Sequence, residues 1–129
     1  MIELSVSRLN KRFGGNHVLK DVSFEVKGAE MIGLIGPNGA GKTTLTNVLD
    51  GAIKPNSGTV YLNGKRIDQL PPFEVAKSGL GRTFQVTRSF RRMTVLENLY
   101  VPALALRKSH IGHELKEQAL EVLESLTLE

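Results

Sequence analysis

A glycine-rich segment holds the residues best suited to chemistry. Residues 36–44 read G-P-N-G-A-G-K-T-T and match the pattern G-x-x-x-x-G-K-[ST], whose loop amides surround phosphate groups. Glycine permits backbone angles closed to residues with a Cβ atom, so successive N–H groups can point at one anion. Lys42 adds an ammonium that can reach the β- and γ-phosphates, and the Thr43 hydroxyl can bind Mg²⁺. We therefore predict a purine nucleoside triphosphate site, formed by Gly36, Pro37, Asn38, Gly39, Ala40, Gly41, Lys42, Thr43 and Thr44.

The elements on either side of this loop must position it. The apolar run Met31–Ile35 predicts a strand buried on both faces, and Leu45, Val48 and Leu49 recur at helical spacing after the loop. The alternative is a glycine-rich turn without a ligand. A strand before the loop and a helix after it favour the phosphate site, because the helix adds its positive end to the anion.

Composition limits the other classes of protein. The chain has 129 residues, which suits one domain, and 40% hydrophobic residues, which suffices for a core. No apolar run approaches the roughly 18 residues that a membrane helix needs, and the N-terminus does not resemble a signal peptide. The absence of cysteine excludes disulfides and thiolate metal sites. We expect a cytosolic protein.

The net charge of +4 could indicate a nucleic-acid partner. Much of the basic excess, however, lies near the loop or in one cluster, Arg82, Arg88, Arg91 and Arg92. Phosphate binding and an acidic partner surface explain that distribution equally well. No nucleic acid is expected as a partner.

Alternating patterns predict the strands. Apolar residues alternate with polar ones over residues 2–6 and 22–26, which predicts two antiparallel strands with one wet face, and the pattern breaks over residues 9–15. Residues 59–67 surround Asn63-Gly64, a pair that accepts the positive φ angles of a tight hairpin turn. A further strand is expected at Leu80–Gln85.

The second half of the chain favours helices. Pro71-Pro72 can open a short helix that ends near Ser78, with Gly79 as its stop. Thr94-Val95-Leu96-Glu97 reads as a capping box, which starts a helix to about Leu106, bent or restarted at Pro102. A last helix buries one apolar face, made of Leu115, Ala119, Val122, Leu123 and Leu126.

Several stretches together resemble the ATP-binding subunits of ABC transporters. Residues 33–45 resemble the Walker A region of that family, and residues 81–85 (G-R-T-F-Q) resemble its Q-loop. Further likenesses lie at residues 22–26, at residues 49–51 with Pro55 and Gly58, and at residues 62–64. A narrower likeness, to the branched-chain amino-acid importer subgroup, lies at residues 82–90 and 93–99. One departure is Ala29, where the family usually has glycine.

The resemblance implies a fold and a domain organisation. It implies an α/β P-loop NTPase of the ABC type, with a mixed sheet whose antiparallel portion surrounds the phosphate-loop helix, and with an incomplete core. Residues 1–129 would form the N-terminal portion of the nucleotide-binding domain. Residues 1–85 would be the β-rich part with the phosphate loop, and residues 86–129 the Q-loop region and the start of the helical subdomain.

The resemblance also implies roles outside the loop. Phe13 lies where the family places an aromatic ring that stacks on adenine, although most members have tyrosine there; the alternative is a core phenylalanine. Val18 would line the same pocket. Gln85 would sense Mg²⁺ and the γ-phosphate and relay this to the membrane partner, acting in catalysis together with Lys42; by itself, a glutamine after a strand indicates nothing.

Other parts of the family pattern do not occur in this sequence. It has no strand ending in an Asp-Glu pair, no Leu-Ser-Gly-Gly signature and no matching histidine; His17, His110 and His113 do not fill the gap and are expected as surface residues rather than metal ligands. We expect the N-terminal, truncated part of a longer subunit, able to bind nucleotide but not to hydrolyse it. Without a neighbouring strand, Met31–Ile35 would have an unpaired edge and favour self-association.

The function that we predict is an energy-coupling ATPase subunit of an importer for branched-chain or other amino acids. Its ligands would be ATP and Mg²⁺. Its partners would be transmembrane permease subunits, through the Q-loop region, and a second nucleotide-binding subunit, on the cytoplasmic inner face of the membrane. Two alternatives remain: a small nucleotide or metabolite kinase, and a soluble ABC-type ATPase of translation or repair.

Overall fold

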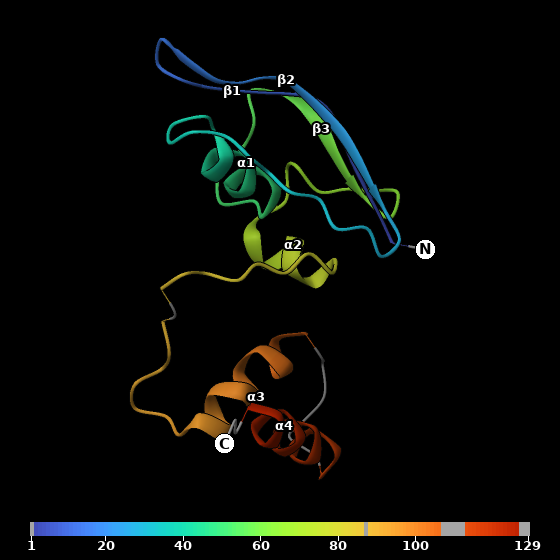
Figure 1. Ribbon diagram of the computed structural model, residues 1–129. Helices are drawn as coiled ribbons and strands as arrows, with labels where there is room; N and C mark the ends of the chain where they lie inside the picture. Colours follow the sequence, from blue (N-terminus) through green and yellow to red (C-terminus); the bar gives the residue numbers. More distant parts are fainter. Residues whose placement is uncertain (1, 87, 107–112, 127–129) are drawn as a thin grey trace. The chain divides into compact units, whose positions relative to one another are not determined.

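The computed structural model describes residues 2–86, 88–106 and 113–126. The chain divides into two compact units, Met1–Arg82 and Thr83–Glu129, and each is described by itself (Figure 1). The first unit holds the strands and the phosphate loop. The second holds two helices.

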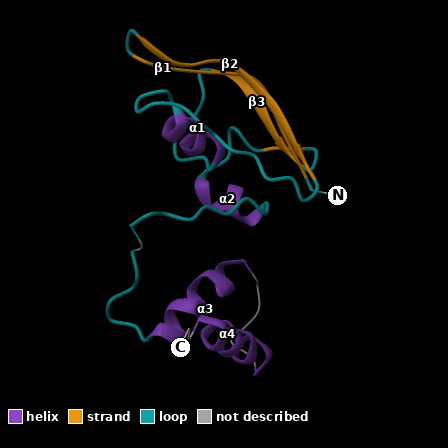
Figure 2. Cartoon of the chain, in the orientation of Figure 1, coloured by secondary structure: helices purple, strands orange, loops and turns teal. Residues whose placement is uncertain are grey.

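The first unit is built on a four-stranded antiparallel sheet with the order β2-β1-β3-β4 (Figure 2). The strands are β1 (Glu3–Phe13), β2 (Asn16–Lys27), β3 (Ser57–Leu62) and β4 (Lys65–Arg66). The predicted antiparallel pairing is confirmed, with Leu4 opposite Val26 and Val6 opposite Phe24. His17 lies within β2.

β1 is longer than its alternation suggests. It continues through the predicted break to Phe13, with register shifts against β2 after Val6. Arg8 and Asp21 take φ angles of 45° and 47° there, and such a bulge shifts the alternation of side chains along the strand. β3 passes the bulge so closely that a Cβ atom at Gly58 would lie 2.4 Å from the Arg8 carbonyl oxygen.

The core of this unit lies between one face of the sheet and the helices α1 (Lys42–Leu49) and α2 (Pro72–Lys77) (Figure 1). Its buried members are Val6, Leu9, Leu19, Leu45, Val48, Val60, Leu62, Ile67 and Val75. The predicted helix after the loop is therefore confirmed, and so is α2, with Pro71 before it and Gly79 after it at a φ of 105°. The Asn63-Gly64 hairpin is also confirmed, at φ angles of 50° and 78°.

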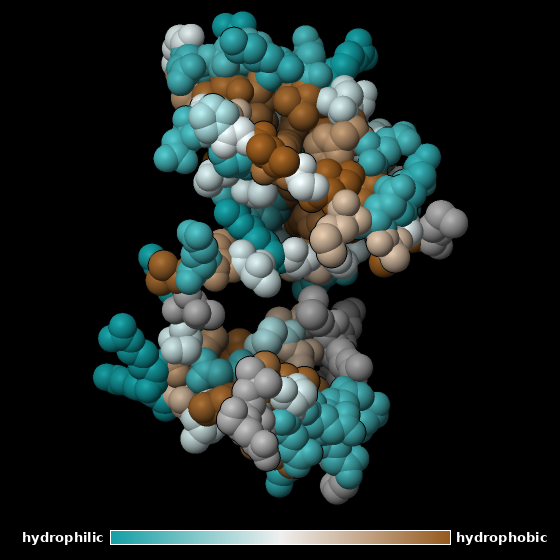
Figure 3. Space-filling model, viewed as in Figure 1, coloured by the Kyte–Doolittle hydropathy of each residue, from teal (hydrophilic) through white to brown (hydrophobic). Residues whose placement is uncertain are grey.

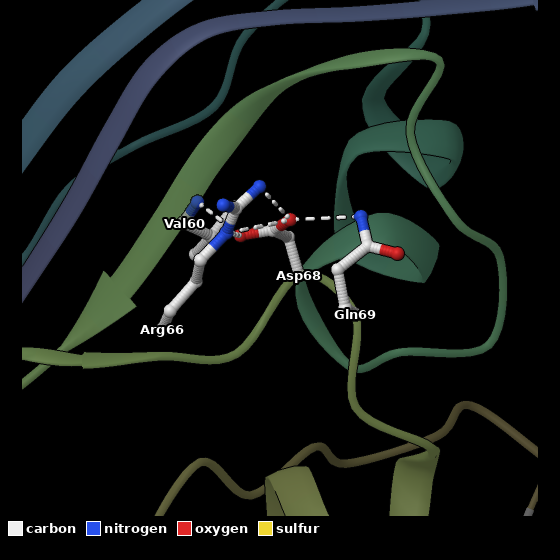
Figure 4. Close-up of polar contacts among 4 residues, drawn as sticks. All are labelled: Val60, Arg66, Asp68 and Gln69. Carbon is white, nitrogen blue, oxygen red and sulfur yellow. Dashed lines mark hydrogen bonds and ion pairs between the residues drawn. The ribbon is translucent and has the colours of Figure 1, made fainter.

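Asp68 is the one buried charged residue of the described part of the chain (Figure 4). Its carboxylate accepts hydrogen bonds from Arg66, from the Val60 N–H at 3.0 Å and from the Gln69 side chain at 2.9 Å. Burial alone would raise the pKa of Asp68, but these hydrogen bonds and the Arg66 charge hold the pKa below its usual range. The carboxylate thereby ties β3 to the segment that leads into α2.

Two predicted strands are wrong. Met31–Ile35 forms no strand, and its side chains are exposed: Met31 98%, Ile32 53%, Leu34 50% and Ile35 94%. Leu80–Gln85 is also a loop. The physical reason is the same for both, because a segment becomes a strand only by pairing with another strand, and the described residues place none next to either segment. Figure 3 shows apolar surface gathered on the visible face of this unit.

The second unit contains α3 (Val95–Leu106) and α4 (His113–Leu126), which contact each other. The capping box is confirmed: Glu97 accepts from the Thr94 N–H at 2.7 Å, and the Glu97 N–H donates to the Thr94 hydroxyl at 3.2 Å. α3 runs through Pro102 without restarting.

The apolar face predicted for α4 is only partly buried: Ala119 is 7% exposed, but Val122 and Leu126 are exposed. None of the described helices is both long and apolar enough to cross a bilayer.

Candidate nucleotide site

The phosphate loop forms a tight curve that ends on α1. Gly39 and Gly41 take φ angles of 83° and 93°, the left-handed region that favours glycine. The Ala40 N–H donates to the Pro37 carbonyl at 3.2 Å, and a Cβ atom at Gly36 would lie 3.0 Å from the Ala40 Cβ. The curve therefore depends on small residues at these positions.

α1 begins where the loop closes, and no acidic side chain occupies its N-terminus. Gly41 is the N-cap, no side chain caps the helix, and the first turn has no acidic residue. The first N–H groups of a helix lack partners inside the helix and carry a partial positive charge. Such a helix start can accept a phosphate.

Lys42 extends back over the loop. Its Nζ donates to the carbonyl oxygens of Gly36 and of Pro37, the latter at 2.7 Å. The ammonium is thus held at the loop itself, where an incoming phosphate would compete with those carbonyls for it. Thr43 is exposed, and its carbonyl accepts from the Thr46 hydroxyl at 3.0 Å.

The loop, α1 and the β1–β2 hairpin enclose a pocket of about 350 Å³. Its lining residues are Phe13, Asn16, Val18, Asn38, Gly39, Gly41, Lys42, Thr43 and Thr44. The structure therefore brings Phe13 and Val18, predicted from the resemblance, to the same pocket as the loop. Gly36, Pro37 and Ala40 shape the loop without lining the pocket. Phe13 is 49% exposed, so the alternative of a core phenylalanine is wrong.

Close packing of the loop on β2 explains the need for glycine at position 41. A Cβ atom at Gly41 would lie 3.2 Å from the Val18 carbonyl oxygen and from side-chain atoms of Val18 and Leu19. Sequence reasoning did not find Asn16, although it directly follows the Gly14-Gly15 turn and pairs with Phe13 in the sheet. The Gly14-Gly15 turn was the signal available in the sequence, because a two-residue turn places Asn16 opposite Phe13.

Gln85, predicted to act at the phosphate site, and Arg82, predicted as part of a basic cluster, are placed as follows. Gln85 is exposed and belongs to the unit Thr83–Glu129, whereas the loop belongs to the unit Met1–Arg82. Arg82, which we assigned to a basic cluster, instead donates hydrogen bonds to two side chains. These are Asn47, within α1, and Asp50, the residue that caps the C-terminal end of α1. Within the described ranges, no three His, Cys, Asp or Glu side chains are grouped as metal ligands, and His110 lies outside those ranges.

Comparison with known proteins decides the family. The family model described as "ABC transporter" matches residues 19–129. The chain belongs to the ABC transporter family. Among curated members, LivG of Salmonella typhimurium, named a high-affinity branched-chain amino acid transport ATP-binding protein, is 49% identical over 98 residues, which are 76% of this chain and 38% of LivG. LptB of Haemophilus influenzae, named a lipopolysaccharide export system ATP-binding protein, is 36% identical over 125 residues, which are 97% of this chain and 52% of LptB.

Solved ABC cassettes share the fold. The ADP conformation of MJ1267 superposes with a TM-score of 0.79 at 36% identity, over 96% of this chain and 53% of that one. A dimeric cassette, MJ0796 bound to ADP and Pi, has a TM-score of 0.80 at 28% identity, over 98% of this chain and 58% of that one. The predicted fold, a partial ABC-type α/β cassette, is confirmed. The chain spans well under two thirds of the length of these relatives. Because the chain matches the ABC transporter family, the alternative of a small nucleotide or metabolite kinase is wrong.

Proposed function

We propose that residues 36–44 bind the triphosphate of ATP together with Mg²⁺. The observation that carries the proposal is one pocket that Phe13 lines together with the glycine loop, Lys42 and the uncapped start of α1. Loop and helix amides would hold the phosphates, and the Thr43 hydroxyl would be a Mg²⁺ ligand. Phe13 and Val18 would contact the adenine. In the complete protein, Gln85 would act with Lys42 in catalysis and contact Mg²⁺.

The wider role that we propose is the energy-coupling ATP-binding subunit of an importer for branched-chain or other amino acids. LivG, named a branched-chain amino acid transport protein, is 49% identical over 98 residues, which supports this assignment. The partners would be permease subunits, contacted through the Q-loop region, and a second nucleotide-binding subunit. The complex would lie on the cytoplasmic face of the membrane. Co-purification with hydrophobic membrane subunits, rather than with ribosomes or DNA, tests this role.

For the chain itself we propose binding without hydrolysis. Residues 1–85 would form the β-rich part of the nucleotide-binding domain, and residues 86–129 the Q-loop region and the start of its helical subdomain. A phosphate loop binds, but hydrolysis also requires a group that orients the attacking water. A turnover rate typical of complete ABC ATPases, measured on this chain, would contradict the proposal.

The binding experiment uses labelled ATP with Mg²⁺ and the variant Lys42→Ala. We expect the variant to lose most ATP retention, because the ammonium supplies the side-chain charge at the loop. Lys20→Ala is the matched control, since Lys20 is an exposed lysine of β2 outside the pocket and its loss changes the net charge equally. Equal retention by Lys42→Ala and by the unmodified chain would overturn the assignment of the site.

A further inference from the structure

The ring of Phe13 is supported by a lysine of its own strand. The Nζ atom of Lys11 lies 5.1 Å from the centre of the Phe13 ring, a cation–π distance. The same Nζ donates to the carbonyl oxygen of Lys54 at 2.7 Å. Lys11 is not a residue of the pocket that Phe13 lines, so it contacts the ring from outside that pocket.

A second contact joins the same strand to the segment after α1. Asn56 accepts from the Arg12 N–H at 2.6 Å through its side-chain oxygen, and its own N–H donates to the Asn10 carbonyl at 2.9 Å. Residues 54–56 are therefore bonded to residues 10–12, the strand positions directly before Phe13. Because this segment follows the phosphate-loop helix, it connects the end of α1 to the end of β1.

We propose that Lys11 and Asn56 are positioning residues, which hold the Phe13 ring at a fixed place above the phosphate loop so that a purine base can stack on it. The proposal rests on the proposed function and deepens it. Phenylalanine has no hydroxyl with which to anchor the tip of its ring, and Phe13 is half-exposed beside a two-glycine turn. Lys11 contacts the ring, Asn56 holds the strand position before it, and neither residue lines the pocket.

This arrangement predicts a selective effect on the nucleoside half of the ligand. A ring that is already ordered loses less conformational freedom when the base stacks on it, whereas the phosphates contact only the loop and the helix start. Weakening the support should lower the affinity for ATP but leave the affinity for inorganic tripolyphosphate unchanged. A general loss of structure would lower both.

The test measures binding of Mg-ATP and of Mg-tripolyphosphate to the whole chain by calorimetry. Lys11→Met keeps the aliphatic stem and removes the cation, and Asn56→Ala removes the acceptor of the Arg12 N–H. Each should weaken ATP by about two- to tenfold, the cost of ordering one side chain. Lys11→Arg and Asn56→Asp should restore most of the affinity, and Lys20→Ala controls for the lost charge.

Each outcome bears on the proposal. Unchanged ATP affinity in both weakened variants would overturn it, and so would an equal loss for ATP and tripolyphosphate, because the effect would then lie at the loop. The Phe13→Ala variant separates the two proposals. If it binds ATP as tightly as the unmodified chain does, and the unmodified chain binds tripolyphosphate, the ring has no role; the proposal for Lys11 and Asn56 then fails, while the proposed phosphate site stands. If the unmodified chain binds neither ligand, the proposed function fails with it. Thermal unfolding of each variant verifies that it is folded.

Discussion

The guanidinium of Arg82 forms an ion pair with the carboxylate of Asp50 at the C-terminal end of α1, with an Nη1–Oδ2 distance of 2.5 Å. Both side chains are partly buried, at 27% and 18% exposure. The same nitrogen donates to the Asn47 side chain at 2.6 Å. The residue that opens the R-T-F-Q stretch is thus bonded to the far end of the phosphate-loop helix.

Replacing Arg82 with alanine should destabilise the first unit. The change leaves two partly buried acceptors without this donor, and hydrogen bonds to charged groups contribute about 1.5–3 kcal/mol. Arg88→Ala is the control, because Arg88 is exposed, and its effect should stay within about 0.5 kcal/mol. Urea unfolding followed by circular dichroism measures both. Equal stabilities of the two variants would contradict the importance of the Arg82 contacts.

The Asp68 carboxylate should make stability depend on acid. Its pKa in the folded state is lowered from the usual value of 3.8, so its contribution is present above that value and is lost as the pH falls through the folded-state pKa. Asp68→Asn should cost about 2–4 kcal/mol at neutral pH, because an amide cannot accept the Arg66 bonds at both positions. Unfolding measured from pH 7 to pH 2 should show a flatter acid limb in the variant. An unchanged acid limb would contradict this.

Gly58→Ala should be far more harmful than Gly64→Ala. Both glycines have a positive φ, at 91° and 78°, so both substitutions cost about 1–2 kcal/mol of backbone strain. At Gly58 the new Cβ would also meet the backbone of Arg8 and Leu9 at 2.4–2.7 Å, whereas nothing lies within 4 Å at Gly64. The clash should add a further ~1–3 kcal/mol. Similar unfolding midpoints would show that the bulge can move away.

The exposed segment Met31–Ile35 should drive self-association at tens of micromolar protein. The segment forms no strand and exposes Met31, Ile32, Leu34 and Ile35, so it offers a template on which another chain can pair. Ile35→Glu should shift the sedimentation coefficient toward that of a monomer. Phe73→Glu, at an exposed apolar position of α2, should not. A strictly monomeric unmodified chain would disprove the prediction.

Local signals in the sequence predicted local structure well. The loop pattern with its helix, the Asn63-Gly64 turn and the Thr94–Glu97 capping box each depend on residues close in sequence, and all three have the predicted geometry. The strand predicted at Met31–Ile35 is absent, because an apolar run forms a strand only when a neighbouring strand is present to pair with it. Sequence periodicity carries no information about that neighbour.

Contacts between distant residues could not be predicted. The sequence around Arg82 does not indicate that its partner is Asp50 rather than a phosphate. The sequence around Phe13 does not indicate that Lys54 and Asn56 bind the two residues before it. These pairs form because the sheet brings separate stretches together. The pocket residues known from the loop pattern needed no such information, whereas Asn16 depended on the hairpin register.

The central place of β1 in the sheet has a consequence for the order of folding. β1 can pair with β2 early, since only a two-glycine turn separates them, but its other neighbour brings Leu4 beside Leu62. The whole glycine loop and α1 lie in the chain that this second pairing must close, and closing a long loop is slow. The pairing of β1 with β3 should therefore form later than the β1–β2 hairpin.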